Sequence, residues 1–386
     1  MKKICIITAT RAEYGLLKPL MHKLKESNQF KLQVVVTGAH LSPEFGLTYR
    51  FIEADGFSID EKVEMLLSSD TPSGIVKSMG VAQMGFADLF NRFVPDAVVL
   101  LGDRYEMLSI AAAATIFTIP IIHLHGGEIT EGAYDDAIRH AVSKLSAVHF
   151  TSTEEYRQRL IQMGENPNKV YNVGAIGLDN IVELPLLNRE ELEENLGIKF
   201  KKYNFQVTFH PETLSDMSSE EQFEILLQAI RQQKNSYFIF TKANADTNGR
   251  IINQMIDKFV LENSNVASAY DSLGSLRFLS VVKICDAIVG NSSSGIIEAP
   301  SLRTATINIG DRQRGRTQAD SILNCNVEFN DVLRCFKTVK DDGFKKLLMN
   351  VQNPYGEGGT SDKIVQILSQ LEWGDLKIKK FHNIAI

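Results

Sequence analysis

The sequence predicts an α/β protein built from two doubly wound parallel sheets that face each other across a cleft. Short apolar runs rich in β-branched residues alternate with segments whose apolar residues recur at helical spacing, as in parallel sheets with crossover helices. The alternation stops at residues 185–204 and then resumes. In each half a hydrophobic strand ends in glycine and a polar residue, Gly-Asp at 102–103 and Gly-Asn at 290–291. Such strand ends are where ligands bind in open sheets.

The first half opens with strand, helix and strand within residues 4–36. The run 4–8 is short, apolar and β-branched, which indicates a strand buried on both faces. Leucines and a methionine recur at helical spacing in 16–24, which predicts an amphipathic helix. The expected strands are 4–8, 32–36, 96–101, 119–124, 148–151 and 170–173. The expected helices are 16–24, 75–93, 105–117, 135–146 and 153–163.

The second half repeats this alternation. Residues 185–204 are charged and show no strand pattern, so we predict a linker there between a domain at 1–184 and a domain at 205–360. We expect residues 361–386 to form a C-terminal helix and tail that packs back on the first domain. The expected strands are 206–209, 237–241, 266–269, 286–289 and 304–309. The expected helices are 219–233, 248–262, 275–284 and a short one from 294.

The composition narrows the class of protein. Hydrophobic residues make up 44% and charged residues 23%, which are ordinary globular values, and the net charge of −6 argues against a nucleic-acid partner. Four cysteines lie far apart without a C-x-x-C pair, which favours reduced thiols in a cytoplasmic protein. The longest apolar run, 108–122, contains Pro120 and is shorter than the roughly 20 residues of a membrane span, so no membrane partner is expected.

Charged residues gather at expected strand ends between Gly102 and His140. Asp103 ends one strand, and His125 and Glu128 end the next. His123 and His125 alternate along a strand and point to opposite faces, which argues against a shared metal. The pattern favours acid–base chemistry by a histidine and several carboxylates, with no metal and no cofactor.

A helix is expected to begin at Asp135, with Arg139 four residues later on the same face. The two side chains can therefore pair. The alternative is an ordinary ion pair on the helix surface.

Two loops in the second half have the composition of anion sites. Residues 290–295, Gly-Asn-Ser-Ser-Ser-Gly, lie between a strand and a helix, where small residues and hydroxyls can cradle a diphosphate. Residues 311–316 carry three arginines, which suit forked recognition of phosphate. A serine-capped turn and a solvated basic loop are the alternatives.

Two further residues follow expected strands. Arg11 can meet phosphate or nucleotide, or pair with Glu13 at the surface. His210, stiffened by Pro211, can transfer a proton, hold a phosphate or be structural. Neither a G-x-G-x-x-G nor a Walker A pattern is present, so a nicotinamide fingerprint and a P-loop are excluded.

Taken together, these motifs resemble the UDP-N-acetylglucosamine 2-epimerase family, and most closely its hydrolysing branch, over residues 3–372. The motifs are Gly-Asp-Arg at 102–104, His-Leu-His-Gly-Gly-Glu at 123–128, Asp-Asp-x-Ile-Arg-His at 135–140, His-Pro at 210–211, Gly-Asn-Ser-Ser-x-Gly at 290–295 and the arginine run at 310–316. The resemblance implies two Rossmann-like domains of the glycosyltransferase-B type. It also implies a homodimer or homotetramer.

The chemistry that the resemblance implies is anti elimination of UDP from UDP-N-acetylglucosamine to a glycal. Water then adds at C1 and a proton returns to C2 from the opposite face, which gives N-acetylmannosamine and UDP. The implied acid–base and orienting residues are Asp103, His125, Glu128, Asp135, Arg139 and His210. The implied substrate and UDP contacts are Arg11, Arg104, Ser292, Ser293, Gly295, Glu298 and Arg312. Some family members carry glutamate in place of His125, so which group is the base and which the acid stays open.

Four alternatives remain at the level of sequence. One is the same reaction on UDP-2,4-diacetamido-2,4,6-trideoxy-glucose, on the route to legionaminic rather than sialic acid. A second is a non-hydrolysing epimerase, and a third is a glycosyltransferase of the same fold, although no feature marks an acceptor site. The fourth is an inactive nucleotide-sugar sensor, against which the intact Asp103, Glu128 and His210 speak.

Overall fold

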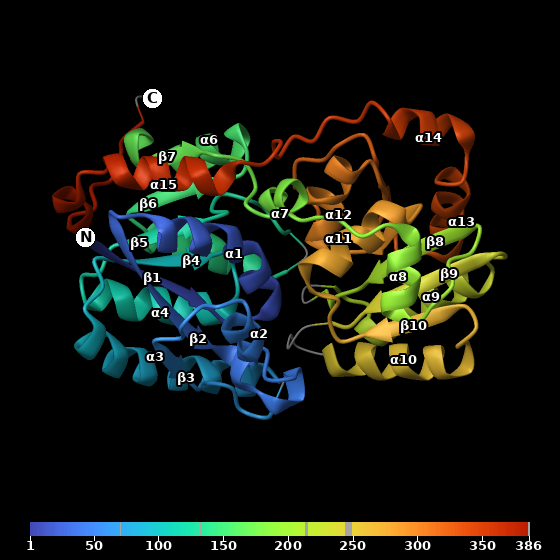
Figure 1. Cartoon of the computed structure of the whole chain (residues 1–386), viewed down its shortest axis with the longest axis horizontal. Coiled ribbons are helices and arrows are strands. Elements are labelled where there is room, and N and C mark those ends of the chain that lie inside the picture. The colour runs from blue at the N-terminus through green and yellow to red at the C-terminus, as the bar shows by residue number, and fades with distance from the viewer. Residues whose placement is uncertain (70, 132, 213–214, 244–248, 385–386) are drawn as a thin grey trace. The chain divides into compact units, whose positions relative to one another are not determined.

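The computed structural model of the chain describes residues 1–69, 71–131, 133–212, 215–243 and 249–384. It divides into two compact units, whose course along the chain is shown in Figure 1. Unit 1 consists of residues 1–128, 135–179 and 358–386, and unit 2 consists of residues 129–134 and 180–357.

Unit 1 contains a seven-stranded parallel sheet in the order β3-β2-β1-β4-β5-β6-β7. Its strands are β1 Lys2–Thr8, β2 Phe30–Thr37, β3 Glu61–Val63, β4 Ala97–Leu101, β5 Ile121–Leu124, β6 Val148–Thr151 and β7 Val170–Asn172. The strand order reverses direction between β1 and β4. This is the switch point outside which open sheets bind their ligands.

Helices cover the sheet of unit 1. They are α1 Arg11–Glu26, α2 Tyr49–Ala54, α3 Pro72–Phe93, α4 Tyr105–Ile116, α5 Asp135–Leu145, α6 Glu154–Gln162 and α15 Thr360–Gln370, with 3₁₀ turns η1 Gly38–Leu41, η2 Pro43–Phe45, η3 Pro167–Lys169 and η5 Trp373–Lys377. Helix α1 begins five residues before the predicted start at 16. The reason is a capping box, in which Thr10 accepts from the backbone of Glu13 and Glu13 accepts from the backbone of Thr10.

The C-terminal segment completes unit 1. Helix α15, red in Figure 1, packs against α1, blue. Asp179 caps its N-terminus, because its two carboxylate oxygens accept from the backbone N–H groups of Thr360 at 2.8 Å and Ser361 at 2.7 Å. Further on, the Lys379 ammonium donates to the carbonyls of Lys144 at 2.6 Å and Ser146 at 2.7 Å, at the end of α5.

A buried ion cluster joins this tail to the sheet. Glu165 is 2% exposed and receives His149 Nε2 at 2.9 Å, Lys144 Nζ at 2.7 Å and Lys379 Nζ at 2.7 Å. Burial by itself raises the pKa of Glu165, but the hydrogen bonds from His149 and the two lysines outweigh it and lower the pKa to about 2.

Glu165 should therefore make unit 1 sensitive to acid. A carboxyl group with a depressed pKa stabilises the fold above its ordinary pKa of 4.5, and that stabilisation is lost as the pH falls through about 2. Urea unfolding at pH 7, 5 and 3 should show Glu165→Gln to be less stable than the parent protein at pH 7 by about 3 kcal/mol. The difference should shrink at pH 3. Glu155→Gln, at a carboxylate 54% exposed, is the control and should follow the parent at every pH.

Unit 2 contains a six-stranded parallel sheet in the order β10-β9-β8-β11-β12-β13. Its strands are β8 Tyr203–Thr208, β9 Ser236–Thr241, β10 Ala267–Tyr270, β11 Ala287–Gly290, β12 Ala305–Ile309 and β13 Ile322–Cys325. Its helices are α8 Arg189–Leu196, α9 Ser219–Arg231, α10 Gly249–Glu262, α11 Gly274–Ile284, α12 Ser293–Ile297, α13 Phe329–Thr338 and α14 Asp342–Leu348, with the 3₁₀ turn η4 Ala299–Leu302. Helix α7, Leu178–Glu183, spans the point where the chain leaves unit 1. The strand order of this sheet reverses between β8 and β11.

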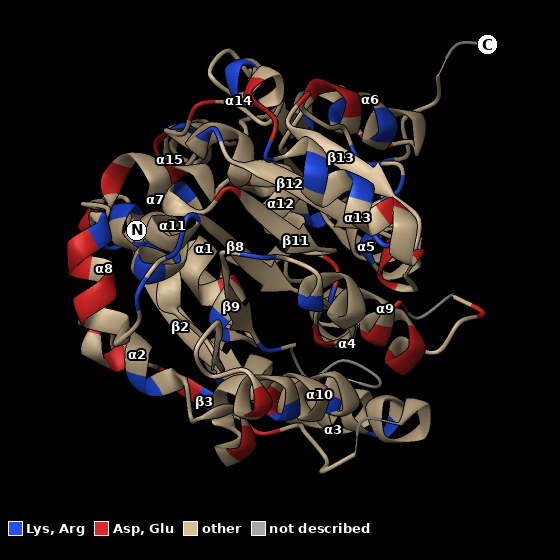
Figure 2. Ribbon diagram, turned by 90° about the vertical axis from the view of Figure 1, so that its right-hand side faces the viewer, with Lys and Arg blue, Asp and Glu red and all other residues tan. Residues whose placement is uncertain are grey.

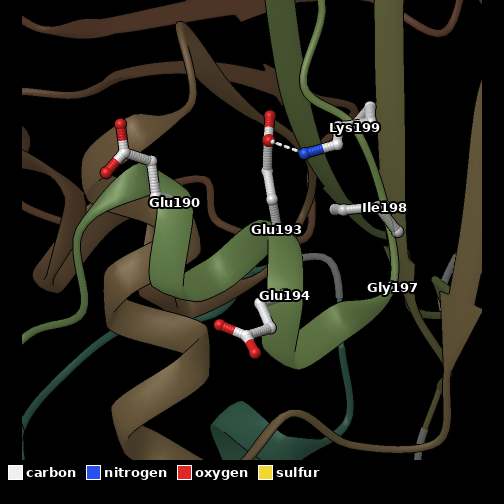
Figure 3. Close-up of a pocket in the computed structure, with 6 residues that line it drawn as sticks. All are labelled: Glu190, Glu193, Glu194, Gly197, Ile198 and Lys199. Atoms are coloured by element: carbon white, nitrogen blue, oxygen red, sulfur yellow. Dashed lines mark hydrogen bonds and ion pairs between the residues drawn. The ribbon is translucent and has the colours of Figure 1, made fainter.

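The segment predicted as a linker, 185–204, is part of unit 2 and contains α8. Leu192, Ile198 and Phe200 are buried in a cluster with residues of β9 and α11. The prediction missed this packing because α8 has only two apolar residues among mostly acidic ones, and Figure 2 shows it as a largely red helix. Figure 3 shows the hollow beside it, where Glu193 accepts from Lys199 Nζ at 2.7 Å while Glu190 and Glu194 point elsewhere.

Two further findings concern the whole set of described residues. No helix among them is long and apolar enough to cross a membrane. The four cysteines, Cys5, Cys285, Cys325 and Cys335, are buried and free.

Candidate active site

Asp103 lies at the switch point of unit 1. Gly102 follows β4 in a left-handed conformation with φ of 77°, which turns the chain sharply after the strand. The Asp103 carboxylate accepts from a terminal nitrogen of Arg139, whose side chain is 2% exposed against 22% for Asp103. Arg139, on α5, therefore pairs with the carboxylate that follows β4. The Arg139 side chain is buried and is not part of a surface ion pair. This pair fixes the orientation of the Asp103 carboxylate, while 22% of the side chain remains exposed.

His125 and Glu128 form a second pair at the end of the neighbouring strand, β5. The backbone N–H of Ile176 donates to His125 Nε2 at 3.3 Å, so the proton of the neutral ring lies on Nδ1. Nδ1 then donates to Glu128 Oε1 at 2.7 Å, and Ser152 Oγ donates to the same oxygen at 2.7 Å. Both ring nitrogens are engaged, so the arrangement orients Glu128.

His123 lies within β5, whereas His125 follows the strand with a left-handed φ of 63°, so strand alternation does not extend to His125. His123 Nε2 donates to the carbonyl of Gly102 at 2.7 Å and its Nδ1 lies 3.0 Å from Ser143 Oγ. Burial lowers the pKa of His123 to about 3, so the ring is neutral near neutral pH. His123 thus has a structural role, since it ties the end of β5 to the residue that precedes Asp103.

Helix α5 carries the remaining residues of this group. Asp135 and Asp136 occupy its first turn, where negative charge is favoured by the helix dipole. Asp136 lies 3.5 Å from His140 Nε2, one turn along. The carboxylates of Asp135 and Asp136 start α5, while Asp103 follows β4 and Glu128 follows β5. All four therefore belong to unit 1.

Arg11 and Arg104 follow β1 and β4, on the two sides of the switch point. The Arg11 guanidinium stacks 4.1 Å from the centre of the Phe51 ring. Glu13 is buried and caps its own helix, so it is not the surface partner that the sequence allowed for Arg11. Arg104 donates two hydrogen bonds to the carboxylate of Glu106, from Nε to Oε2 at 3.2 Å and from a terminal nitrogen to Oε1 at 3.1 Å.

In unit 2, Asn291 joins the two strand ends at the switch point. Its Oδ1 accepts from the backbone N–H of His210 at 2.7 Å, and its Nδ2 donates to the carbonyl of His210 at 2.8 Å. Gly290 precedes it with φ of 129°, and a Cβ there would lie 2.0 Å from the carbonyl oxygen of Thr208. The end of β11 is therefore held tightly against the end of β8, which places His210 beside the serine loop.

The serine loop, residues 291–295, leads into α12. Ser292 caps this helix, with Oγ accepting from Ser294 N at 3.4 Å. Gly295 approaches β12 closely, because a Cβ would lie 2.6 Å from Thr306 Cγ2, and its carbonyl accepts from Thr306 Oγ1 at 2.6 Å. Glu298, 6% exposed, follows the helix. The hydroxyls of Ser292 and Ser293 therefore lie just beyond the C-terminal end of β11.

The arginine loop, residues 310–316, follows β12 and reaches the serine loop. Arg312 donates to the Asn291 carbonyl at 3.1 Å, and Gln313, fully buried, donates to the same oxygen at 2.8 Å. Arg314 is 67% exposed and pairs with Glu131 at 3.2 Å. Of these two arginines, only Arg312 is therefore directed toward the serine loop.

The structure brings the predicted residues together as two groups. Asp103, His125, Glu128, Asp135, Arg139, Arg11 and Arg104 belong to unit 1, and His210, Ser292, Ser293, Gly295, Glu298 and Arg312 belong to unit 2. Sequence reasoning named Asn291 and Gln313 only as members of their motifs, and it did not single out Ser152 or the carboxylate pair around Arg104. Of the latter residues, only Glu13 carried a signal, the capping box. Among the described residues no group of three or more His, Cys, Asp or Glu side chains is placed to hold a metal ion.

Known proteins resemble this chain in sequence and in structure. A hydrolysing GDP/UDP-N,N'-diacetylbacillosamine 2-epimerase of Campylobacter jejuni is 45% identical over 345 residues, 89% of each chain. Polysialic acid biosynthesis protein P7 of Escherichia coli is 42% identical over 386 residues, 100% of this chain and 98% of the relative. Among solved structures, the UDP-GlcNAc 2-epimerase of Neisseria meningitidis bound to UDP-GlcNAc superposes with a TM-score of 0.79 at 19% identity, over 96% of this chain and 100% of that one.

These similarities assign both the fold and the family. The two parallel sheets with flanking helices form a fold of the glycosyltransferase-B type, as predicted. The family model described as UDP-N-acetylglucosamine 2-epimerase matches residues 22–369. The chain therefore belongs to the UDP-N-acetylglucosamine 2-epimerase family.

Proposed function

We propose that this protein is a hydrolysing 2-epimerase whose preferred substrate is UDP-2,4-diacetamido-2,4,6-trideoxy-glucose, the UDP form of N,N'-diacetylbacillosamine. The 45% identity over 89% of each chain to a hydrolysing epimerase of that sugar carries the proposal. UDP-N-acetylglucosamine, the substrate that the sequence motifs favour, is the second candidate. It is supported by the 42% identity to a polysialic acid biosynthesis protein.

The proposed reaction divides between the two groups of residues. In unit 1, one of the acid–base groups removes the proton from C2 while the bond between C1 and the diphosphate oxygen breaks, which forms the C1–C2 double bond of a glycal. Water then adds its oxygen to C1 and C2 receives a proton on the opposite face, so that one water is consumed and the free 2-epimeric sugar and UDP are released. The Asp103–Arg139 pair and the Glu128–His125–Ser152 group are the candidates for these proton transfers.

The leaving diphosphate needs compensation for its negative charge, and unit 2 is proposed to supply it. Ser292 and Ser293 offer hydroxyls, Gly295 lets the loop approach β12 closely, and Arg312 adds a guanidinium. Glu298 is proposed to accept from the ribose hydroxyls, and His210 to lie next to the diphosphate.

An assay of the two UDP sugars side by side, at equal concentration, tests which of them is the preferred substrate. We expect the diacetamido sugar to give the higher kcat/KM, with a free sugar and UDP as products. A higher kcat/KM for UDP-N-acetylglucosamine would reverse the order of the two substrates. A sugar nucleotide as product would identify a non-hydrolysing epimerase, and dependence on an added acceptor sugar would identify a transferase.

Reaction in heavy water tests the elimination. Because the proton on C2 is exchanged with solvent, the product should carry one deuterium at C2 when analysed by mass spectrometry and proton NMR. A product without deuterium at C2 would exclude this mechanism.

Arg312→Ala should weaken UDP binding by about ten- to a hundredfold, because a hydrogen bond to a charged group contributes roughly 1.5–3 kcal/mol. Isothermal titration with UDP measures this change. Arg314→Ala is the matched control, since Arg314 lies two residues away and pairs with Glu131 on the surface. Equal affinities for the two variants would remove Arg312 from the diphosphate site.

We further propose that the enzyme acts in the cytoplasm as a homodimer or homotetramer. Light scattering of the purified protein measures the oligomeric state.

A further inference from the structure

Arg104 is enclosed by two glutamates at the switch point of unit 1. Glu106 is fully buried and receives both Nε and a terminal nitrogen of Arg104, at 3.2 and 3.1 Å. Glu13 approaches from the start of α1, with Oε1 4.0 Å from Arg104 Nε. The side chains of Arg104 and Glu13 are 14% and 9% exposed. The guanidinium therefore has one orientation, fixed by a forked ion pair on one side and a second carboxylate on the other.

The charges of this buried triad do not balance. Two carboxylates face one guanidinium, which leaves a surplus negative charge when all three are ionised. Glu13 Oε2 accepts from the backbone N–H of Ala9 at 2.7 Å and of Thr10 at 3.2 Å. Glu13 Oε1, in contrast, has no hydrogen-bond partner among the described residues. An ionised carboxylate with one buried oxygen unsatisfied is costly, so the triad is poised to accept a proton at Glu13.

The electrostatics of Glu13 agree with this geometry. Burial raises the pKa of the carboxyl, Arg104 lowers it, Glu106 raises it, and the two backbone N–H groups lower it, with a net pKa of about 7. The protonation state of Glu13 thus changes within the neutral range, where an added negative charge nearby shifts it further toward the protonated form.

We propose that Glu106 and Glu13 are positioning residues for Arg104, and that Glu13 takes up a proton when the anionic nucleotide binds there. The proposal rests on the proposed function and on the contact between Arg104 and the UDP sugar that the family resemblance implies. Glu106 fixes the fork of the guanidinium, and protonation of Glu13 removes the surplus negative charge that opposes the incoming diphosphate. The affinity for UDP therefore weakens as the pH rises above neutral.

Titration calorimetry of UDP at pH 7.5, in two buffers of different ionisation enthalpy, counts the protons taken up on binding. UDP itself titrates in this range, so the quantity of interest is the difference between the parent protein and Glu13→Gln. The parent protein should take up a larger fraction of a proton, and its Kd should rise more steeply between pH 6.5 and 8.5. Glu53→Gln removes an exposed carboxylate that pairs with Lys62, and its proton count should match that of the parent. Equal proton counts for the parent and Glu13→Gln would overturn the role of Glu13.

Glu106→Gln tests the positioning of the guanidinium. It should raise the Kd for UDP by about tenfold and raise KM more than it lowers kcat, because a neutral amide holds the fork less firmly. Arg104→Lys should show the same loss in spite of its retained charge. An unchanged Kd in a folded Glu106→Gln protein would overturn the role of Glu106. Turnover of the parent enzyme is measured separately. A parent protein that is inactive on both UDP sugars would reject the proposed function. The proton count would still decide whether Glu13 takes up a proton when UDP binds.

Discussion

Asp103→Asn should lower kcat by about 10²- to 10⁴-fold, the range contributed by a positioned proton-transfer group, while the Kd for UDP stays nearly unchanged. Asparagine has the shape of aspartate and can still accept a hydrogen bond from Arg139, but it cannot exchange a proton with the sugar. The diphosphate is proposed to bind in unit 2, so the substitution leaves those contacts intact. UDP release under saturating substrate gives kcat, and titration calorimetry gives the Kd.

The control for this prediction is Asp362→Asn. Asp362 carries the same functional group in the same unit and pairs with Lys23 on the surface. It should retain most of the activity. Because Asp103→Asn also removes the charge beside the buried Arg139, thermal melts of both variants are needed to compare folded protein. Near-normal turnover of Asp103→Asn would remove Asp103 from the acid–base machinery.

Gly290→Ala should destabilise unit 2 by about 3 kcal/mol or more. Two costs add: a φ of 129° is almost confined to glycine, and the new methyl group would lie 2.0 Å from the Thr208 carbonyl oxygen. Neither strand can give way, because Gly290 and Thr208 are paired in the parallel ladder between β11 and β8. Urea unfolding followed by circular dichroism measures the loss.

Gly46→Ala separates the two costs. Gly46 also has a positive φ, 82°, but nothing lies within 4 Å of the position of a Cβ. Only the backbone cost of about 1 kcal/mol should appear. If both variants lose the same stability, the close approach between β11 and β8 contributes nothing.

The central strands of both sheets were predictable from the sequence, whereas two edge strands were not. The strands β1, β4 and β11 are largely apolar and buried on both faces, and β8 is buried although apolar and polar residues alternate in it. The ends of all four strands carry the residues that the motifs identify. β3 has only three residues, two of them charged, and β13 pairs with a single neighbour. Short edge strands bury little, so they leave little pattern in the sequence.

The sequence motifs proposed the residues of the candidate site, but they did not predict how these residues pair. Helical spacing suggested Asp135, four residues away, as a partner of Arg139, but it could not indicate the pair with Asp103, 36 residues away, that the structure shows. The tautomer of His125 depends on the backbone of Ile176, 51 residues distant. Such contacts are set by the order of strands in the sheet, and spacing along the chain carries no record of them.

The return of the C-terminal segment to unit 1 has a consequence for how the chain folds. Residues 180–357 of unit 2 stand between the two main parts of unit 1, so a ribosome must finish unit 2 before α15 and Lys379 emerge. Until then α1 lacks the helix that packs against it, α5 lacks the ammonium at its last carbonyls, and Glu165 lacks one of its two lysines. Unit 2, almost continuous in sequence, can complete its core first, and the part of the chain made earliest is the last to close.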